Sequence, residues 1–441
     1  MALTKVTSKV LEDNLTVAGN LDVSSGTIKL NGNYPTGSNN VAFGYNALSD
    51  GSLSGGSNTA VGHIALQANT TGANNAGFGR SALQLNTTGS NNTASGMYAL
   101  LNNTTANNNT AVGYAALQEN TTGASQTAVG AYALDAVTTG TQNTAVGATA
   151  FSSVTTANNN TGLGTGAGVS TTTGASNIAI GVSALYSNVS GGSNVAIGQD
   201  SLYYNTASNN TAVGHNAMVA NTTGTQNVAV GYAALDANTT ASDNTAVGYN
   251  SLTANTTGTR NTALGTYTLT ANSTGNYNTA VGWAALDLNT TASYNTAVGH
   301  SSLGANTTGT GNTAIGYGAL DANTTSSYNT GIGNDALTAS TSSGNTALGA
   351  NAGDTTVTTG DYNILIGAFS ELGGAGQENQ IVIGSNASGK GSNTGFITPN
   401  GGAMYQGNNS SSWSTVSDRR IKKNIVDNTI GLDAINQIQV T

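Results

Sequence analysis

A short motif recurs along most of the chain at a nearly constant spacing, and this repeat limits the possible folds more than any other feature. The motif reads Asn-Thr-Ala-Val-Gly, and a leucine and an Asn-Thr-Thr-Gly turn follow it. Its glycine occurs 21 times between Gly44 and Gly384; sixteen of the 20 intervals are 17 residues, two are 16 and two are 18. Loops between ordinary domains do not keep such a spacing, so we expect each repeat to form one coil of a stack.

The residue types within the repeat favour β-strands over helices. Seventeen residues are too few for the helix pair of common helical repeats, and Thr, Asn and Gly are poor helix formers. Apolar or β-branched residues alternate with small ones in the motif, as in Thr59, Ala60 and Val61. Alternation with period two is typical of a strand. The sequence therefore predicts an all-β protein, a parallel β-solenoid (β-roll) of about 21 coils with a 17-residue repeat.

The alternation also suggests which side chains form the core. We expect Thr59 and Val61 to face the inside of the coil and Ala60 to face outward, where its small size would let a neighbouring chain approach. The leucine four residues after each glycine, such as Leu252, is expected to be the core residue of a second strand. The Asn-Thr-Thr-Gly segment, as at 69–72, is expected to turn the chain through left-handed backbone angles.

The repeat divides the chain into four regions. The solenoid shaft covers residues 37–388. Residues 1–36 alternate in hydrophobicity from Leu15 to Leu30 and predict short strands, either a module that attaches the protein to a virion or a cap on the open end of the stack. Residues 389–416 predict a short β neck, and residues 417–441 differ from everything before them.

Composition excludes several classes of function. Only 7% of residues are charged and the formal net charge is −9, which disfavours nucleic acid as a partner because phosphate contacts need clustered Lys and Arg. The chain has no cysteine, and we find no zinc cluster, calcium-binding repeat or phosphate-binding loop, so no metal or other cofactor is expected. It also has no apolar run long enough for a signal peptide or a membrane span, and we expect synthesis in a host cytoplasm without membrane insertion.

Aromatic residues recur at two positions of the repeat. The residue after the repeat glycine is His63, His215 or His300 in three coils and a bulky aromatic residue in others, which predicts an outward-facing column rather than a metal site. A second column precedes the repeat asparagine. Exposed aromatic rings on a rigid rod suit stacking on sugar rings, although they can also serve only to stabilise the stack. The receptor-binding candidates are Tyr277, Tyr294, Tyr328, Tyr362, Trp283 and Tyr317.

Two coils carry sequences that resemble a known family. Asn177–Gly181 reads NIAIG and Asn194–Gly198 reads NVAIG, and both are similar to the strands of trimeric autotransporter adhesin heads. The resemblance implies a β-roll of which three copies associate along an inner face. The repeat of 17 residues is longer than the usual coil of that family.

The C-terminal residues carry a second resemblance. Residues 417–425 read SDRRIKKNI, which resembles the opening of the intramolecular chaperone domain of phage tail fibres and spikes of the self-cleaving endosialidase type. In that family the chaperone trimerises the fibre and is then cut off, which here implies cleavage between Ser417 and Asp418 with Lys422 as the base that activates the serine. The family domain is much longer, so the resemblance implies that residues 417–441 are its truncated beginning.

The sequence therefore predicts a structural phage fibre, on the tail or the head of the virion, that links the virion to a host-surface receptor, for which a glycan is a candidate. We expect a homotrimer whose N-terminus binds a virion protein, and no enzymatic activity apart from the single self-cleavage. Three alternatives remain open: a bacterial trimeric adhesin head, an ice-binding solenoid with regular threonine columns, and a surface depolymerase, for which we find no catalytic residues.

Overall fold

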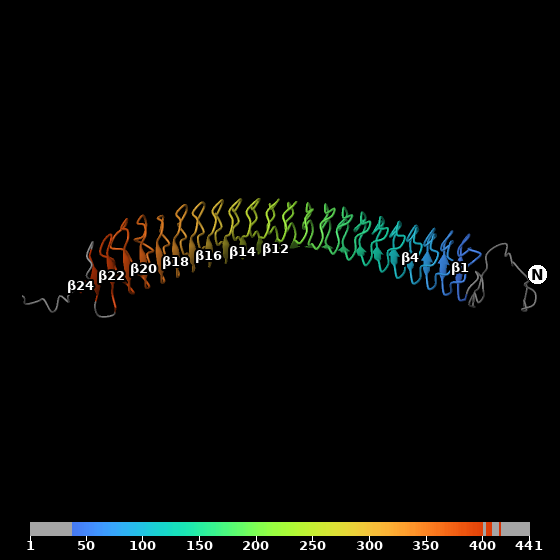
Figure 1. The fold of residues 1–441 in the computed structure, drawn as a ribbon, viewed down its shortest axis with the longest axis horizontal. Coiled ribbons are helices and arrows are strands. Elements are labelled where there is room, and N and C mark those ends of the chain that lie inside the picture. The colour runs from blue at the N-terminus through green and yellow to red at the C-terminus, as the bar shows by residue number, and fades with distance from the viewer. Residues whose placement is uncertain (1–37, 400–402, 408–413, 416–441) are drawn as a thin grey trace, which may run out of the picture.

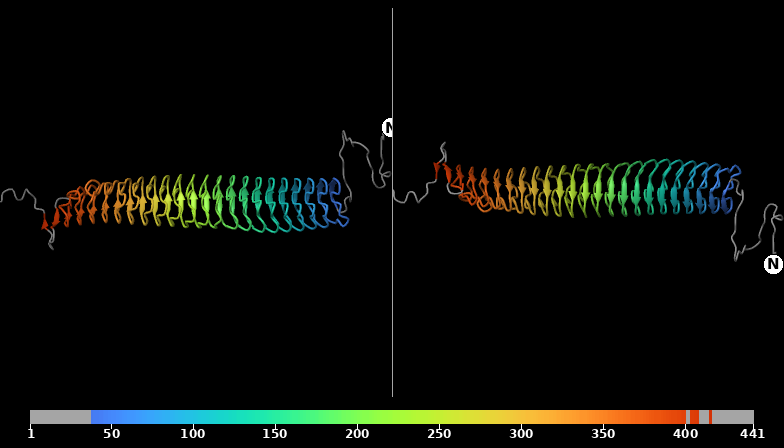
Figure 2. Two further views of the ribbon diagram at one scale, coloured as in Figure 1. Left: turned by 90° about the horizontal axis from the view of Figure 1, so that it is seen from above. Right: turned by 90° about the horizontal axis from the view of Figure 1, so that it is seen from below.

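The computed structural model describes residues 38–399, 403–407 and 414–415. These residues form a long, gently bent rod of stacked coils (Figures 1 and 2). All strands belong to one 24-stranded sheet, and nearly all are three residues long. Their bounds are β1 Val41–Phe43, β2 Thr59–Val61, β3 Ala76–Phe78, β4 Thr93–Ser95, β5 Thr110–Val112, β6 Thr127–Val129, β7 Thr144–Val146, β8 Thr161–Leu163, β9 Ile178–Ile180, β10 Val195–Ile197, β11 Thr211–Val213, β12 Val228–Val230, β13 Thr245–Val247, β14 Thr262–Leu264, β15 Thr279–Val281, β16 Thr296–Val298, β17 Thr313–Ile315, β18 Thr330–Ile332, β19 Thr346–Leu348, β20 Ile364–Ile366, β21 Ile381–Ile383, β22 Gly395–Ile397, β23 Met404–Gln406 and β24 Ser414–Thr415.

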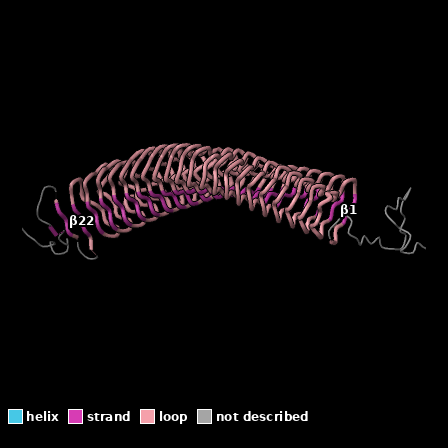
Figure 3. Tube along the Cα trace, turned by 45° about the vertical axis from the view of Figure 1, so that its right-hand side comes forward, coloured by secondary structure: helices cyan, strands magenta, loops and turns pink. Residues whose placement is uncertain are grey.

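Each strand from β1 to β21 pairs in parallel with the strand of the next coil, which confirms the parallel β-solenoid. The register keeps equivalent repeat positions side by side, as when Ala246 of β13 pairs with Ala263 of β14. The strands therefore form a single row along one side of the rod (Figure 3), and the other sides consist of turns. One coil per repeat brings every position of the motif into a column that runs along the rod.

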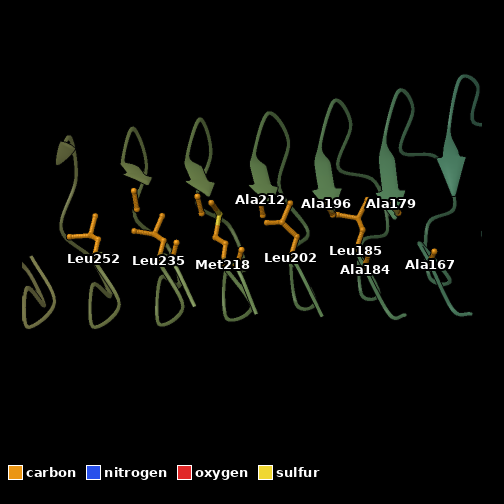
Figure 4. Packing of buried hydrophobic residues seen from close by; sticks show 14 of the residues in the cluster. Ala167, Ala179, Ala184, Leu185, Ala196, Leu202, Ala212, Met218, Leu235 and Leu252 are labelled. Atoms are coloured by element: carbon orange, nitrogen blue, oxygen red, sulfur yellow. The ribbon is translucent and has the colours of Figure 1, made fainter. Parts of the chain in front are cut away.

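The strands face the opposite way from the sequence prediction. Ala60 is fully buried, whereas Thr59 and Val61 are only partly buried. The same pattern holds along the row, where the middle residue of each strand from β2 to β21 is buried and its neighbours are not. The lumen is narrow, and a leucine enters it from the other side, so only a small residue fits on the strand. Figure 4 shows strand alanines such as Ala196 and Ala212 pointing toward Leu202.

The leucine column is part of the core, as predicted, but it does not lie on a second strand. Leu252 is fully buried and lies in a turn with φ 55°. Its backbone N–H donates to the carbonyl of Thr268 in the next coil at 2.9 Å. The hydrogen-bonded stacking of coils therefore continues through the turns, although each described coil has one regular strand.

Two columns of buried asparagines close the lumen on its polar side. The Asn244 side chain donates to the carbonyl of Gly258 at the far end of its own coil, 2.8 Å away, and its Oδ1 accepts from the backbone N–H of Asn261 in the next coil at 2.9 Å. Asn255 donates to the same Gly258 carbonyl at 2.9 Å, and Asn272 of the next coil donates to Asn255 Oδ1. Both asparagines thus tie the coil to itself and to the coil that follows.

The prediction that the Asn-Thr-Thr-Gly segment has left-handed backbone angles is wrong. No residue of 69–72 or 255–258 has a positive φ; these asparagines are instead fixed by their buried hydrogen bonds. Left-handed angles occur just before the repeat asparagine and two and four residues after the repeat glycine, as at Arg260, Asn250 and Leu252. The repeat glycine is also essential: Gly248 has φ 140°, and a Cβ there would lie 2.3 Å from the carbonyl oxygen of Gly265.

The last described strands change direction. β22 still pairs in parallel with β21, but β23 pairs antiparallel with β22, and β24 pairs antiparallel with β23. These strands lie within residues 389–416, where the sequence predicts a β neck. The predictions for residues 1–36 and 417–441 concern segments outside the described residues. No helix of the described part is long and apolar enough to cross a membrane.

Candidate ligand-binding surfaces

The outward face of the strand row is a long surface without charge. The outer residues of β1–β21 are Thr, Val, Ile, Leu, Phe, Ala or Ser, and none is acidic or basic. Several of its large apolar side chains are well exposed, among them Leu264 at 46% and Phe43 at 51%. Because the burial pattern is reversed relative to the prediction, this Thr/Val face, rather than the Ala column, is the surface available to a neighbouring molecule.

A column of aromatic rings lies just after the strand row, as predicted from the sequence, except that Tyr267 joins it from one residue beyond the predicted position, which Thr266 holds. Seven rings on successive coils contact one another in order: His215, Tyr232, Tyr249, Tyr267, Trp283, His300 and Tyr317. The contact between Trp283 and His300 is a stack with centroids 4.6 Å apart and planes at 19°. These side chains are exposed, so the column is a surface feature; we name it the first aromatic column.

The first aromatic column also contains two of the three histidines. His63 lies far from them and stacks on Tyr45 with centroids 5.6 Å apart. Among the described residues no group of three or more His, Cys, Asp or Glu side chains is placed to hold a metal ion. Each histidine stacks on an aromatic ring of an adjacent coil.

The tyrosines before the repeat asparagine border the opposite side of the strand row but do not form one continuous column. Tyr277 and Tyr294 stack with centroids 5.1 Å apart, and the guanidinium of Arg260 lies 5.3 Å from the Tyr277 ring centroid. Tyr328 and Tyr362 stand apart from this pair and are 73% and 65% exposed. The ring of each lies against a glycine of the preceding coil, Gly311 and Gly344 respectively.

Sequence reasoning missed a hollow of about 310 Å³ beside the first aromatic column. It spans three coils, and its lining residues are Trp283, Ala284, Asp287, Leu288, Ser301, Gly304, Ala305 and Asp321. Burial raises the pKa of the Asp321 carboxyl; nearby Asp335 raises it further and His300 acts in the opposite direction. The available signal was the glycine at 304, where the coils before and after carry aspartate.

The predicted self-cleavage residues Ser417, Asp418 and Lys422 lie outside the described residues, so the structure neither brings them together nor separates them. No family model matches the chain, and comparisons with curated proteins and with solved structures gave no significant match. The functional argument therefore depends on the surfaces of the solenoid.

Proposed function

We propose that the chain is a structural fibre protein of a bacteriophage that assembles as a homotrimer and binds a host-surface receptor. The observation that carries the proposal is the uncharged strand face, which runs along the whole rod from β1 to β21. Soluble monomers rarely expose continuous apolar surfaces of more than a few hundred square ångströms. Burial of this face between parallel copies explains its lack of charge, and three rods around a common axis give a stiff fibre.

The remaining surfaces fit the adhesive part of this role. Exposed aromatic rings lie along both margins of the strand face, on a scaffold fixed by hydrogen bonds between coils. Rigid aromatic side chains contribute contact area at low entropic cost. The N-terminal attachment to a virion protein and the C-terminal chaperone complete the proposal. The first rests on the alternating pattern of residues 1–36, for which an end cap is the alternative, and the second on the resemblance of residues 417–425.

Native mass measurement tests the assembly. We expect a species of three times 43.5 kDa, and a stable monomer under native conditions would contradict the proposal. A triple variant with Val213→Lys, Val230→Lys and Val247→Lys places three charges on the strand face and should dissociate the trimer, because like charges would be buried at the interface.

The matched control places the same charges on the same coils but away from that face. Thr223, Thr240 and Thr257 are exposed in the turns, and Thr→Lys at all three should leave the trimer intact. The strand face is not the interface if both variants dissociate equally or if neither variant dissociates.

Ice binding is the second candidate, and the threonine at the first position of many strands favours it. Threonines such as Thr245 and Thr262 lie side by side in register on the outward face, which gives a regular column. Thermal hysteresis of the purified protein distinguishes the two functions. A monomer with strong hysteresis would favour ice binding, and a trimer without hysteresis would favour the fibre.

A further inference from the structure

We propose that the hollow beside Trp283 binds one pyranose unit of a neutral glycan. The inference deepens the proposed receptor-binding function and rests on it.

A missing side chain brings a carboxylate of the next coil into the hollow. Gly304 lies five residues after the repeat glycine, a position that holds Gln84, Thr253 or Thr270 in other coils. A Cβ at Gly304 would lie 2.8 Å from a carboxylate oxygen of Asp321, so the Asp321 side chain occupies the place that a larger residue would need. The glycine therefore leaves room for the Asp321 carboxylate, and the hollow is lined by Gly304 together with residues of the coils before and after it.

Two carboxylates line the hollow. Asp287 and Asp321 occupy the same repeat position in the coils before and after Gly304. Coils are spaced by about 4.8 Å, so their backbones are about 10 Å apart. Carboxylates are strong acceptors for hydroxyl groups, and the hydroxyl of Ser301 lies on the same lining. A compact ring that carries several hydroxyl groups matches this lining.

The remaining lining is apolar and held in place. Trp283 and Leu288 are about half exposed, at 49% and 50%, and Ala284 and Ala305 also line the hollow. His300 stacks on Trp283, and Tyr317 stacks on His300, which restricts the indole ring. Apolar surface with a few fixed polar groups is typical of small-ligand sites, and 310 Å³ is at the lower end of their range, enough for a single ring.

The charge of the lining residues further limits which class of ligand can bind. The lining contains two carboxylates and no lysine or arginine, and in the described residues the one ion pair, between Arg260 and Asp243, involves neither of them. Like charges repel most strongly where solvent is partly excluded. The hollow therefore favours neutral sugars over sialic or uronic acids.

Tryptophan fluorescence of the full chain tests the site. The sequence has two tryptophans, so Trp413→Phe leaves Trp283 as the only reporter. Probes are the methyl pyranosides of glucose, galactose, mannose and N-acetylglucosamine, with N-acetylneuraminic acid as the anionic probe. We expect at least one neutral pyranoside to change the emission saturably, with Kd of about 1 mM. No response to any neutral probe, or a tighter response to the anionic probe, would overturn the proposal.

A filling variant locates the binding. Gly304→Gln introduces a residue that other coils accept at this position and should weaken binding at least about tenfold by occupying the hollow. Ser152 holds the same repeat position in a distant coil, so Ser152→Gln is the matched control and should bind as the parent does. Unchanged binding by Gly304→Gln would overturn the assignment. If that variant unfolds, Asp321→Ala serves instead and should also weaken binding.

Failure of the site and failure of the proposed function give different results. In one outcome the parent binds a pyranoside, but neither the parent nor the Gly304→Gln fibre binds host cells. This result would overturn the receptor role but not the sugar site. Host-cell binding by the parent without any pyranoside response would overturn the sugar site alone.

Discussion

At the scale of single residues, a large side chain in the lumen of one coil is matched by a small one in the neighbouring coil. Phe151 replaces the usual leucine, and the next coil has glycines at two core positions; a Cβ at Gly162 or Gly168 would lie within 2.7 Å of the Phe151 ring. Similarly, Leu365 replaces the strand alanine next to a coil in which Gly353 replaces the leucine. Close packing of this kind requires that large and small residues compensate each other.

A charge in the lumen should disrupt the stack. We expect Leu252→Asp to destabilise its coil by about 4 kcal/mol or more, because an unpaired carboxylate would be buried. Thr257 is exposed in the adjacent turn, and Thr257→Asp should be tolerated. Thermal denaturation and limited proteolysis measure both; equal loss of stability would mean that the coil has its inside and outside reversed.

Acidification should stabilise the shaft at first. Burial raises the pKa of Asp135 and Asp236, so the folded state binds protons at a higher pH than the unfolded state does. Stability therefore rises as the pH falls through the raised pKa values and levels off below the ordinary value near 3.8. Melting temperature measured from pH 7 to pH 4 should increase slightly.

Removal of these two carboxylates should flatten that dependence. Asp135→Asn with Asp236→Asn should melt higher than the parent at pH 7 and gain less on acidification. Asp50 is the control of opposite sign, because hydrogen bonds from Ser52 lower its pKa; Asp50→Asn should make the gain on acidification larger. A parent whose melting temperature only falls below pH 7 would contradict the assignment.

At the scale of the element, each strand is too short to be stable alone. Contacts along the columns of equivalent residues supply the remaining stability. Three-residue strands make few ladder hydrogen bonds, whereas the turns add bonds between coils at almost every column. The repeat glycine is present in all 21 coils, and the asparagine before each strand is replaced only twice, by Gln126 and Gln380. Stability therefore depends on each coil's contacts with its neighbours, as in other repeat proteins.

The glycine column should be intolerant even to one methyl group. Gly248→Ala would force a φ of 140° on a residue with a Cβ and place that Cβ 2.3 Å from the carbonyl oxygen of Gly265. We expect a loss of at least about 3 kcal/mol and increased protease sensitivity near residue 248. Gly51 has no atom near its Cβ position, so Gly51→Ala should have little effect; similar loss in both would contradict this reading.

At the scale of the whole molecule, the regular register makes one long object out of weak units. Every coil places the uncharged strand face on the same side, so a surface that is small in one coil becomes continuous along the rod (Figure 3). This continuity is what makes lateral association of copies a reasonable consequence of the fold. The same argument applies to the first aromatic column.

Self-cleavage is the prediction that concerns the assembled fibre. In a chain that carries the complete chaperone domain, peptide mass mapping should find a mature C-terminus at Ser417. Ser417→Ala should stay uncut but trimeric, and Lys422→Ala should stop or slow the cut because the serine loses its base. Arg419→Ala is the control and should be cut normally. Cleavage of Ser417→Ala at the same bond would refute the Ser–Lys assignment.

The sequence by itself determined the number of coils, the parallel stacking, the buried leucine column and the outward aromatic column. These features follow from spacing: a repeat of 17 residues aligns equivalent positions, and a bulky residue such as Trp283 does not fit a narrow lumen. The C-terminal resemblance is also a property of the sequence, and it stays a prediction.

Only the tertiary structure decided which strand face is the inside and where the hollow lies. Period-two alternation defines two faces of a strand but not which one meets the core, and Ala60 is buried because the leucine opposite it already fills most of the lumen. The left-handed angle of Leu252 and the open position at Gly304 likewise depend on what the adjacent coil brings to the same place. Such contacts join residues of neighbouring coils, so no pattern within one repeat reveals them.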